Sequence, residues 1–251
     1  MLRGKLIAVL ALLVMLAFIP AKSNAADVEG ELTVDILNTY VWRGINFGGN
    51  EGVIQPGLGA SFGGFSIGFW SDYDAEMNKH VETDFMLSYS TEARGIGLEF
   101  GYIYYALDGA LDTTEIYLGV SFDYILNPEV TLYYDLKEGD GAFLVVGIGH
   151  TFEISEDLSL DLSASSGVNF GNEVMGYNED GETFNGMYYG ELGAAVNVEI
   201  TDSITITPKI AYSFALGDDG KFAIESFNGG SGITSDETAI LYGGVGVAVS
   251  F

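Results

Sequence analysis

Carboxylates recur on one phase of an apolar–polar alternation that runs through most of this 251-residue chain. The carboxylates that fall on this phase include Asp35, Glu82, Asp84, Glu99, Glu115, Asp135, Asp161 and Glu191, and two cations, Arg43 and Lys209, share it. Carboxylates that line an aqueous pore lower the energy of entering cations and raise the energy of anions. The chemistry that this set predicts is selective passage of ions, rather than a reaction.

Arg43 is the single residue with the sharpest alternatives. It lies next to Gly44 and is one cation among many predicted lumen acids. It could shape the field at a constriction, or it could lock one strand to a neighbour through an ion pair. The ion pair is the favoured interpretation, because a cation among so many carboxylates must find a partner.

Enzyme chemistry has few candidates here. The chain contains two histidines, His80 and His150, and no cysteine. His150 falls on the apolar phase with no serine predicted beside it, and His80 lies in an acidic loop. That loop has the residue types of an acid-and-His protease, but a solvated acidic loop is far more common. No enzyme and no cofactor are predicted, and the remaining hydrolase hypothesis expects His80→Ala to abolish activity.

The acidic segment "GYNEDGETFNG" invites comparison with a calcium-binding loop. An EF-hand with Gly181 as its central glycine needs acids at its first and twelfth positions. Those positions are Gly176 and Met187, so no metal site is predicted. Loose binding of divalent cations at acidic loops, bridging to anionic lipid headgroups, is the remaining expectation.

The elements that must position these residues are short strands. Alternation with a period of two recurs between clusters of turn residues, and no segment after the first 25 residues has a convincing helical period. The predicted strands are 31–43, 53–62, 65–74, 81–91, 95–107, 114–124, 130–136, 142–153, 158–170, 187–200, 204–216 and 237–251. Pro208 conflicts with a central strand because proline lacks a ladder donor, which predicts either a bulge or a misplaced strand.

The connections between these strands alternate in length. Short turns such as Gly63-Gly64 alternate with longer, acidic, Gly-rich segments, of which 171–186 and 217–236 are the longest. The apolar phase carries residues such as Leu87, Leu98 and Val120, while the other phase carries the charges and many glycines. Together these patterns predict an all-β fold, a transmembrane antiparallel up-and-down β-barrel of about 12 strands with a wet lumen.

The two ends of the chain carry export and assembly features. Residues 1–25 have the charged, apolar and small-residue regions of a signal peptide with cleavage near Ala25, so 26–251 is predicted to be a single barrel domain. The last strand ends on Phe251, with Gly246 five positions earlier, which resembles the assembly signal of bacterial outer-membrane barrels. Val249 departs from that signal, which prefers an aromatic residue there. The implied partners are outer-membrane lipid and the barrel-assembly machinery.

Charge excludes one class of partner. The formal net charge is −27, with 36 acids against nine Lys and Arg. Nucleic acid is therefore not an expected partner, because phosphate contacts need clustered basic residues.

One family resemblance can be placed on particular residues. The run Tyr40-Val41-Trp42-Arg43-Gly44 resembles the start of the TorF-family porins, and "LYYDL" and "GIGHTFEI" are similar to that family's middle. The chain departs from the pattern at Ile45-Asn46-Phe47. The resemblance implies an outer-membrane barrel and assigns no binding residues.

Two functions follow from this reading. The first is a passive outer-membrane channel with an acidic lumen that favours cations or small neutral solutes. The second is a non-conducting barrel that displays its loops, with Arg43 and Lys209 paired to lumen acids and 217–236 folded inward.

Overall fold

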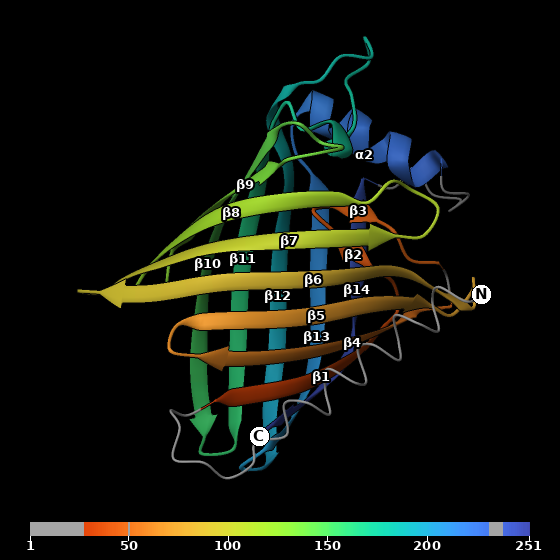
Figure 1. Cartoon of the computed structure of the whole chain (residues 1–251). Coiled ribbons are helices and arrows are strands. Elements are labelled where there is room, and N and C mark those ends of the chain that lie inside the picture. Colours follow the sequence, from red (N-terminus) through yellow and green to blue (C-terminus); the bar gives the residue numbers. More distant parts are fainter. Residues whose placement is uncertain (1–27, 50, 231–237) are drawn as a thin grey trace.

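Twelve strands form a closed antiparallel barrel in the computed structural model, which describes residues 28–49, 51–230 and 238–251 (Figure 1). The predicted signal peptide, 1–25, lies outside the described residues. The barrel strands are β1 (Glu29–Leu37), β4 (Val53–Phe62), β5 (Phe65–Asp74), β6 (Lys79–Ala93), β7 (Ile96–Leu107), β8 (Thr113–Phe122), β9 (Glu129–Asp135), β10 (Ala142–Ser155), β11 (Leu158–Phe170), β12 (Asn185–Thr201), β13 (Ile204–Ala215) and β14 (Ala239–Ser250). Strand β1 pairs with both β14 and β4, so the predicted strand number and closed fold are confirmed.

The two ends of the barrel differ in their connections. At one end, which we call the turn end, β4–β5 and β6–β7 are joined by two-residue turns whose residues all have positive φ. Such turns match the right-handed twist of paired strands. At the opposite loop end, the connections hold two short strands, a 3-10 helix, η1 (Glu173–Met175), and an α-helix, α2 (Asp218–Gly230).

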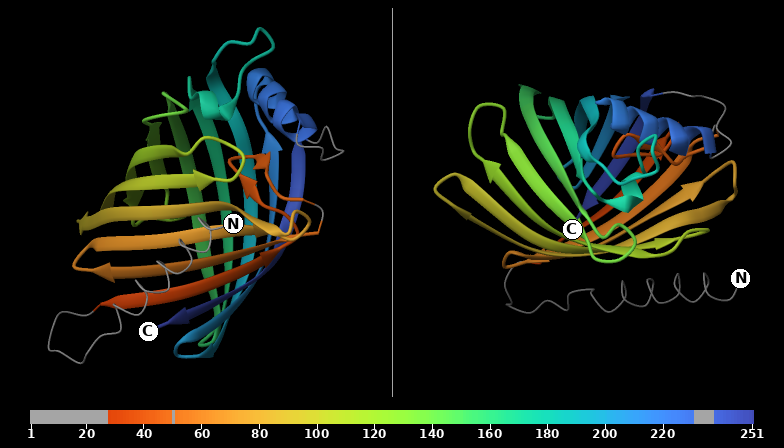
Figure 2. Two further views of the ribbon diagram at one scale, coloured as in Figure 1. Left: turned by 45° about the vertical axis from the view of Figure 1, so that its right-hand side comes forward. Right: turned by 90° about the horizontal axis from the view of Figure 1, so that it is seen from above.

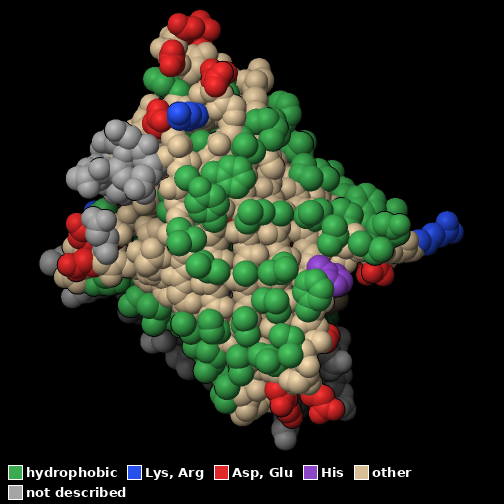
Figure 3. Space-filling model, turned by 180° about the vertical axis from the view of Figure 1, so that it is seen from behind, with side chains coloured by type: hydrophobic (Ala, Val, Ile, Leu, Met, Phe, Trp, Pro, Cys, Tyr) green, Lys and Arg blue, Asp and Glu red, His purple; other side chains and the backbone are tan. Residues whose placement is uncertain are grey.

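The outer face of the wall is apolar. Its exposed side chains include Leu32, Ile36, Phe85, Leu87, Leu98, Phe100, Leu118, Leu192, Val245 and Val247. Figure 3 shows hydrophobic side chains as a broad band on the face opposite to that of Figure 1, with acidic residues gathered above and below it. An apolar band of this extent is what a barrel surrounded by hydrocarbon requires.

Two prolines lie within wall strands without a register shift at either site. The ladder between β12 and β13 passes from the pair Ala195–Lys209 directly to Val198–Ile206, skipping the rungs opposite Pro208. The ladder between β4 and β5 likewise skips the rungs opposite Pro56. The expectation of a bulge or a misplaced strand at Pro208 was therefore wrong. The wall tolerates the missing donor because residue pairs are absent only on the β12 side, while Pro208 remains paired with Val245 of β14.

Two predicted elements need correction. The first strand ends at Leu37 rather than at residue 43, and a separate two-stranded sheet, β2 (Val41–Trp42) and β3 (Ile45–Asn46), follows it. Helix α2 occupies a region predicted to be a loop. Its sequence holds glycines at both ends, and its buried side chains are confined to Ala223, Ile224 and Asn228 on one face. Within the three described ranges, no helix has the length and apolarity to cross a membrane.

Candidate functional site: an internal hairpin in the barrel lumen

The β2–β3 hairpin lies inside the barrel at the loop end (Figures 1 and 2). Its turn is Arg43-Gly44, with φ values of 49° and 85°. Positive φ at both central residues is the requirement of a type I′ turn, for which glycine is well suited and arginine is not. A Cβ at position 44 would lie 2.8 Å from Tyr189 Cβ, so glycine is also required for the close approach to the wall.

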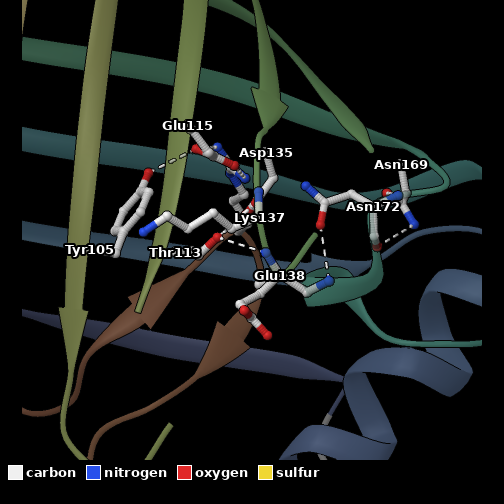
Figure 4. Close-up of polar contacts among 10 residues, drawn as sticks. Tyr105, Thr113, Glu115, Asp135, Lys137, Glu138, Asn169 and Asn172 are labelled. Atoms are coloured by element: carbon white, nitrogen blue, oxygen red, sulfur yellow. Dashed lines mark hydrogen bonds and ion pairs between the residues drawn. The ribbon is translucent and has the colours of Figure 1, made fainter. Parts of the chain in front are cut away.

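The turn places Arg43 against Glu115 of β8. Arg43 Nη1 and Nη2 donate to Glu115 Oε1 and Oε2 at 2.7 and 2.8 Å, a bidentate pair. The side chains of Arg43 and Glu115 are 6% and 2% exposed. The hydroxyl of Tyr105 donates to the same carboxylate at 2.8 Å (Figure 4). The favoured prediction of an ion pair at Arg43 thus agrees with the geometry, although Arg43 sits on a hairpin and not on a wall strand.

Aromatic rings surround the Arg43 guanidinium. Its central carbon lies 4.4 Å from the ring centroids of Trp42 and Tyr133, and 4.7 Å from that of Phe143. Cations are attracted to aromatic faces at these distances. The sequence did not identify Tyr105, Tyr133 or Phe143 as functional, because each lies on a wall strand far from Arg43 in the chain.

A hydrophobic cluster fills the lumen beside this ion pair. Its members are contributed by the hairpin, η1, α2 and the wall: Ile45, Phe143, Met175, Phe184, Tyr188, Tyr189, Ala223 and Ile224. Ile45, Met175 and Tyr188 are completely buried. A dry cluster of this kind fills space that water would otherwise occupy. The loop-end half of the lumen is therefore packed rather than open.

Helix α2 covers the hairpin at the mouth, as the view from above shows (Figure 2). Asn228, which is 1% exposed, accepts a hydrogen bond from Asn46 N at 3.2 Å. The rings of Phe47 and Phe227 lie edge to face with centroids 6.4 Å apart. The described part of the region 217–236 thus packs on the hairpin as a helix at the mouth.

Loop-end connections are held by further hydrogen bonds around the site (Figure 4). Thr113 Oγ1 donates to both Asp135 carboxylate oxygens at 2.7 Å and accepts from Glu138 N at 3.2 Å. Asn172 N donates to Asn169 Oδ1 at 3.1 Å. These bonds fix the connections that flank the buried pair.

Several predicted lumen carboxylates accept hydrogen bonds from neutral groups. Glu99 accepts from the hydroxyl of Tyr117, and Glu191 accepts from the hydroxyl of Tyr242 at 2.9 Å. Asp161 accepts from Thr151 Oγ1 at 2.6 Å and from Asn197 Nδ2 at 2.7 Å. Neutral donors orient a carboxylate without cancelling its charge.

The second predicted cation forms a more exposed pair. Lys209 Nζ lies 2.7 Å from Asp35 Oδ1, and the two side chains are 36% and 28% exposed. A Cβ at Gly246 would lie 2.4 Å from the same Asp35 oxygen. Gly246 therefore leaves room for this ion pair, a role separate from the assembly signal suggested by its position.

Glu82 and Asp84 lie on β6 near other acids. Glu82 pairs across the ladder with Asp72, and Gln55 Nε2 donates to Asp72 Oδ1 at 2.9 Å. Asp84 is 8% exposed. Among the described residues, no three His, Asp or Glu side chains gather in a way that could hold a metal ion.

The turn-end half of the lumen contains open space. A chamber of about 820 Å³ is lined by residues of several strands, including Glu31, Ser66, Met86, Glu99 and Tyr117. A second space of about 460 Å³, lined by Glu92, Glu99 and Glu129 among others, shares Glu99 with the first. The open half of the lumen is therefore rich in glutamate.

The structure reveals one Ser–His contact that the sequence did not predict. Ser71 Oγ lies 3.1 Å from His80 Nδ1. The Ser71 hydroxyl donates to the carbonyl oxygen of Glu82 at 2.8 Å, and Ser71 is 3% exposed. A hydroxyl that is buried and already donates to the backbone is poorly placed to attack a substrate.

The predicted assembly-signal residues lie along the closing seam. Val249 pairs with Leu32 on β1 and with Ile204 on β13. Phe251 and Gly30 exchange two backbone hydrogen bonds of 2.9 Å, and the Phe251 ring lies over Gly30. Phe251 remains 69% exposed.

Comparison with known proteins places the fold. No protein-family model and no curated protein matches the chain, so the resemblance to the TorF family is not confirmed. Among solved structures, the chain is similar to the NanC porin, with 13% identity, a TM-score of 0.51, and coverage of 90% of this chain and 99% of that one. It is also similar to the KdgM porin in complex with disordered oligogalacturonate, with 11% identity, a TM-score of 0.52, and coverage of 89% and 99%. The chain is thus a closed, 12-strand antiparallel β-barrel of the porin type.

Proposed function

We propose that this protein is a narrow, passive channel of the bacterial outer membrane with an acidic lumen that favours cations or small neutral solutes. In this proposal the chain is exported, cleaved near Ala25 and assembled by machinery that reads the strand ending at Phe251. Membrane lipid then covers the apolar outer face. The similarity to porins supports the fold of such a channel and leaves selectivity to this chain's own residues.

The observation that carries the proposal is that several predicted lumen carboxylates accept hydrogen bonds from neutral side chains. Glu99, Asp161 and Glu191 accept hydrogen bonds from Tyr, Thr and Asn side chains. In this proposal, carboxylates that accept only from neutral donors contribute negative charge along the inner wall. A narrow path lined by one sign of charge concentrates ions of the opposite sign.

The packed loop end supports a low conductance. The Arg43 hairpin and the hydrophobic cluster occupy the lumen there, and α2 covers the hairpin at the mouth. Barrels of eight strands are filled by side chains, whereas those of 16–18 strands enclose open pores. A 12-strand barrel with an internal hairpin therefore fits a small channel better than a wide one.

Reversal potentials in planar bilayers test the proposed selectivity. Under a KCl gradient, refolded protein should show cation preference, and Glu99→Gln should reduce it. Glu179→Gln is the matched control, because it removes the same charge from an exposed residue of the loop between β11 and β12. Anion preference in the unmodified protein, or an equal effect of the two substitutions, would contradict the proposal.

A closed barrel that displays its loops is the second candidate, and the buried hairpin favours it. Solute uptake into liposomes separates the two functions, because a barrel closed by the hairpin admits no solute. Uptake of small cations by vesicles that contain folded protein would exclude this second function. Loose binding of divalent cations at the acidic loops is compatible with both functions.

A further inference from the structure

The surroundings of Arg43 have the composition of a receptor for a free guanidinium ion. Glu115 presents both carboxylate oxygens to the two Arg43 Nη atoms, and Tyr105 Oη donates to the same carboxylate. Tyr133 and Phe143 provide aromatic faces at 4.4 and 4.7 Å. The planar fork of a guanidinium matches a bidentate carboxylate, whereas an ammonium is a point charge.

The groups that form this receptor belong to the barrel wall, and the cation belongs to a separate hairpin. Tyr105 lies on β7, Glu115 on β8, Tyr133 on β9 and Phe143 on β10, which are consecutive strands. All four groups of the receptor therefore belong to the wall and none belongs to the hairpin. Arg43 reaches it from a residue with φ of 49°, a conformation that costs a non-glycine residue free energy.

The receptor lies next to the acidic chamber of the turn end. Glu99 lines both turn-end spaces and accepts a hydrogen bond from Tyr117. The ring of Tyr117 lies 5.5 Å from the ring of Tyr133, whose face contacts Arg43. Acidic and aromatic groups thus continue from the chamber to Glu115.

We propose that Glu115, Tyr105, Tyr133 and Phe143 form a guanidinium-binding site that Arg43 occupies as a tethered ligand. The site selects guanidinium-bearing cations over ammonium ions of similar size. Its place at the end of a cation path rests on the proposed channel function, but the existence of the site does not.

Substitution of Arg43 by glycine empties the site with little damage to the turn. Glycine adopts φ of 49° readily, so Arg43→Gly removes the side chain without adding backbone strain. Arg94→Gly is the matched control, because Arg94 also precedes a glycine in a turn of positive φ and lies in an exposed connection.

The test measures binding of methylguanidinium and methylammonium to refolded protein by titration calorimetry. Arg43→Gly should bind methylguanidinium with an affinity roughly tenfold higher than that for methylammonium, as expected when a bidentate fork replaces a point charge. The unmodified protein and Arg94→Gly should show no such binding, and adding Glu115→Gln to Arg43→Gly should abolish it. Equal affinity for the two ions, or binding that survives Glu115→Gln, would overturn the proposal.

A folding assay covers the case in which the emptied variant does not fold alone. Methylguanidinium should then raise the refolded yield of Arg43→Gly several-fold, whereas methylammonium should not. Equal yields with the two ions would count against the site.

Measurements of ionic current across a bilayer separate this proposal from the channel function. If no variant conducts although methylguanidinium binds Arg43→Gly, the channel function fails and the binding site stands.

Discussion

In the part of the chain that the structure describes, the dipeptide Arg-Gly forms two turns with similar φ values. Arg43-Gly44 has φ values of 49° and 85°, and Arg94-Gly95 has 57° and 75°. Arg43 is buried against Glu115 inside the barrel, whereas Arg94 lies in the exposed turn between β6 and β7. The backbone therefore gains a tight hairpin in both places, and only the surroundings of the arginine differ.

The conformation of these turns does not depend on the arginine side chain. A type I′ turn can be made by Gly-Gly, as Gly63-Gly64 shows in the turn between β4 and β5. Arginine is therefore not needed for the turn itself. At position 43 its guanidinium supplies the counterion for a buried carboxylate, which would otherwise be costly to bury.

The largest expected contrast is between Arg43→Gly and Arg94→Gly. Removing one partner of a buried ion pair typically costs about 3–5 kcal/mol, because the other charge is left uncompensated. An exposed substitution usually changes stability by less than about 0.5 kcal/mol. Urea unfolding of both variants in micelles measures the difference, and similar midpoints for the two would show that Arg43 contributes little to stability.

The glycines that follow the two arginines should differ in how well they tolerate an added side chain. Gly44→Ala should destabilise the barrel by about 2–4 kcal/mol, because it adds left-handed strain and a contact with Tyr189. At Gly95 the nearest atom to an added Cβ is Asp123 Cβ at 3.6 Å, so Gly95→Ala should cost only the strain, about 1 kcal/mol. Unfolding in urea provides the measurement, and equal losses would argue against close packing of the hairpin turn.

The smallest expected effects concern ion pairs outside the hairpin. Lys209→Met breaks the partly exposed pair with Asp35 and should cost about 1 kcal/mol. Lys79→Met breaks a pair with Asp108 whose side chains are 47% and 54% exposed, and no measurable change is expected. Thermal unfolding at two salt concentrations checks both, since the Lys209 effect should persist at high salt more than any Lys79 effect.

The barrel itself could be predicted from the sequence because its signals are local. Alternation with a period of two, glycine-rich turns and the contrast between short and long connections all act within a few residues. The pairing of Arg43 with Glu115 depends on residues 72 positions apart, so a single sequence could suggest a partner's charge but not its identity.

The hairpin and α2 escaped prediction for a related reason. An internal strand such as Val41–Trp42 has the same alternation as the wall, so its sequence pattern indicates an extension of the first strand. Helix α2 is stabilised by its contacts with β12 and the hairpin, and its glycine content gives little helical preference of its own. Gly220, for example, lies close to the backbone of Met187 and Tyr188, an approach that a larger residue would prevent.

The rungs skipped beside Pro56 and Pro208 have a consequence for how the wall exchanges with solvent. Amide groups beside a missing rung are released by smaller openings than those in a continuous ladder. Amide hydrogen–deuterium exchange should therefore be fastest within the wall along two ladders, β4–β5 and β12–β13. The strands from β6 to β11, whose ladders are unbroken by proline, would form the slowest-exchanging sector of the cylinder.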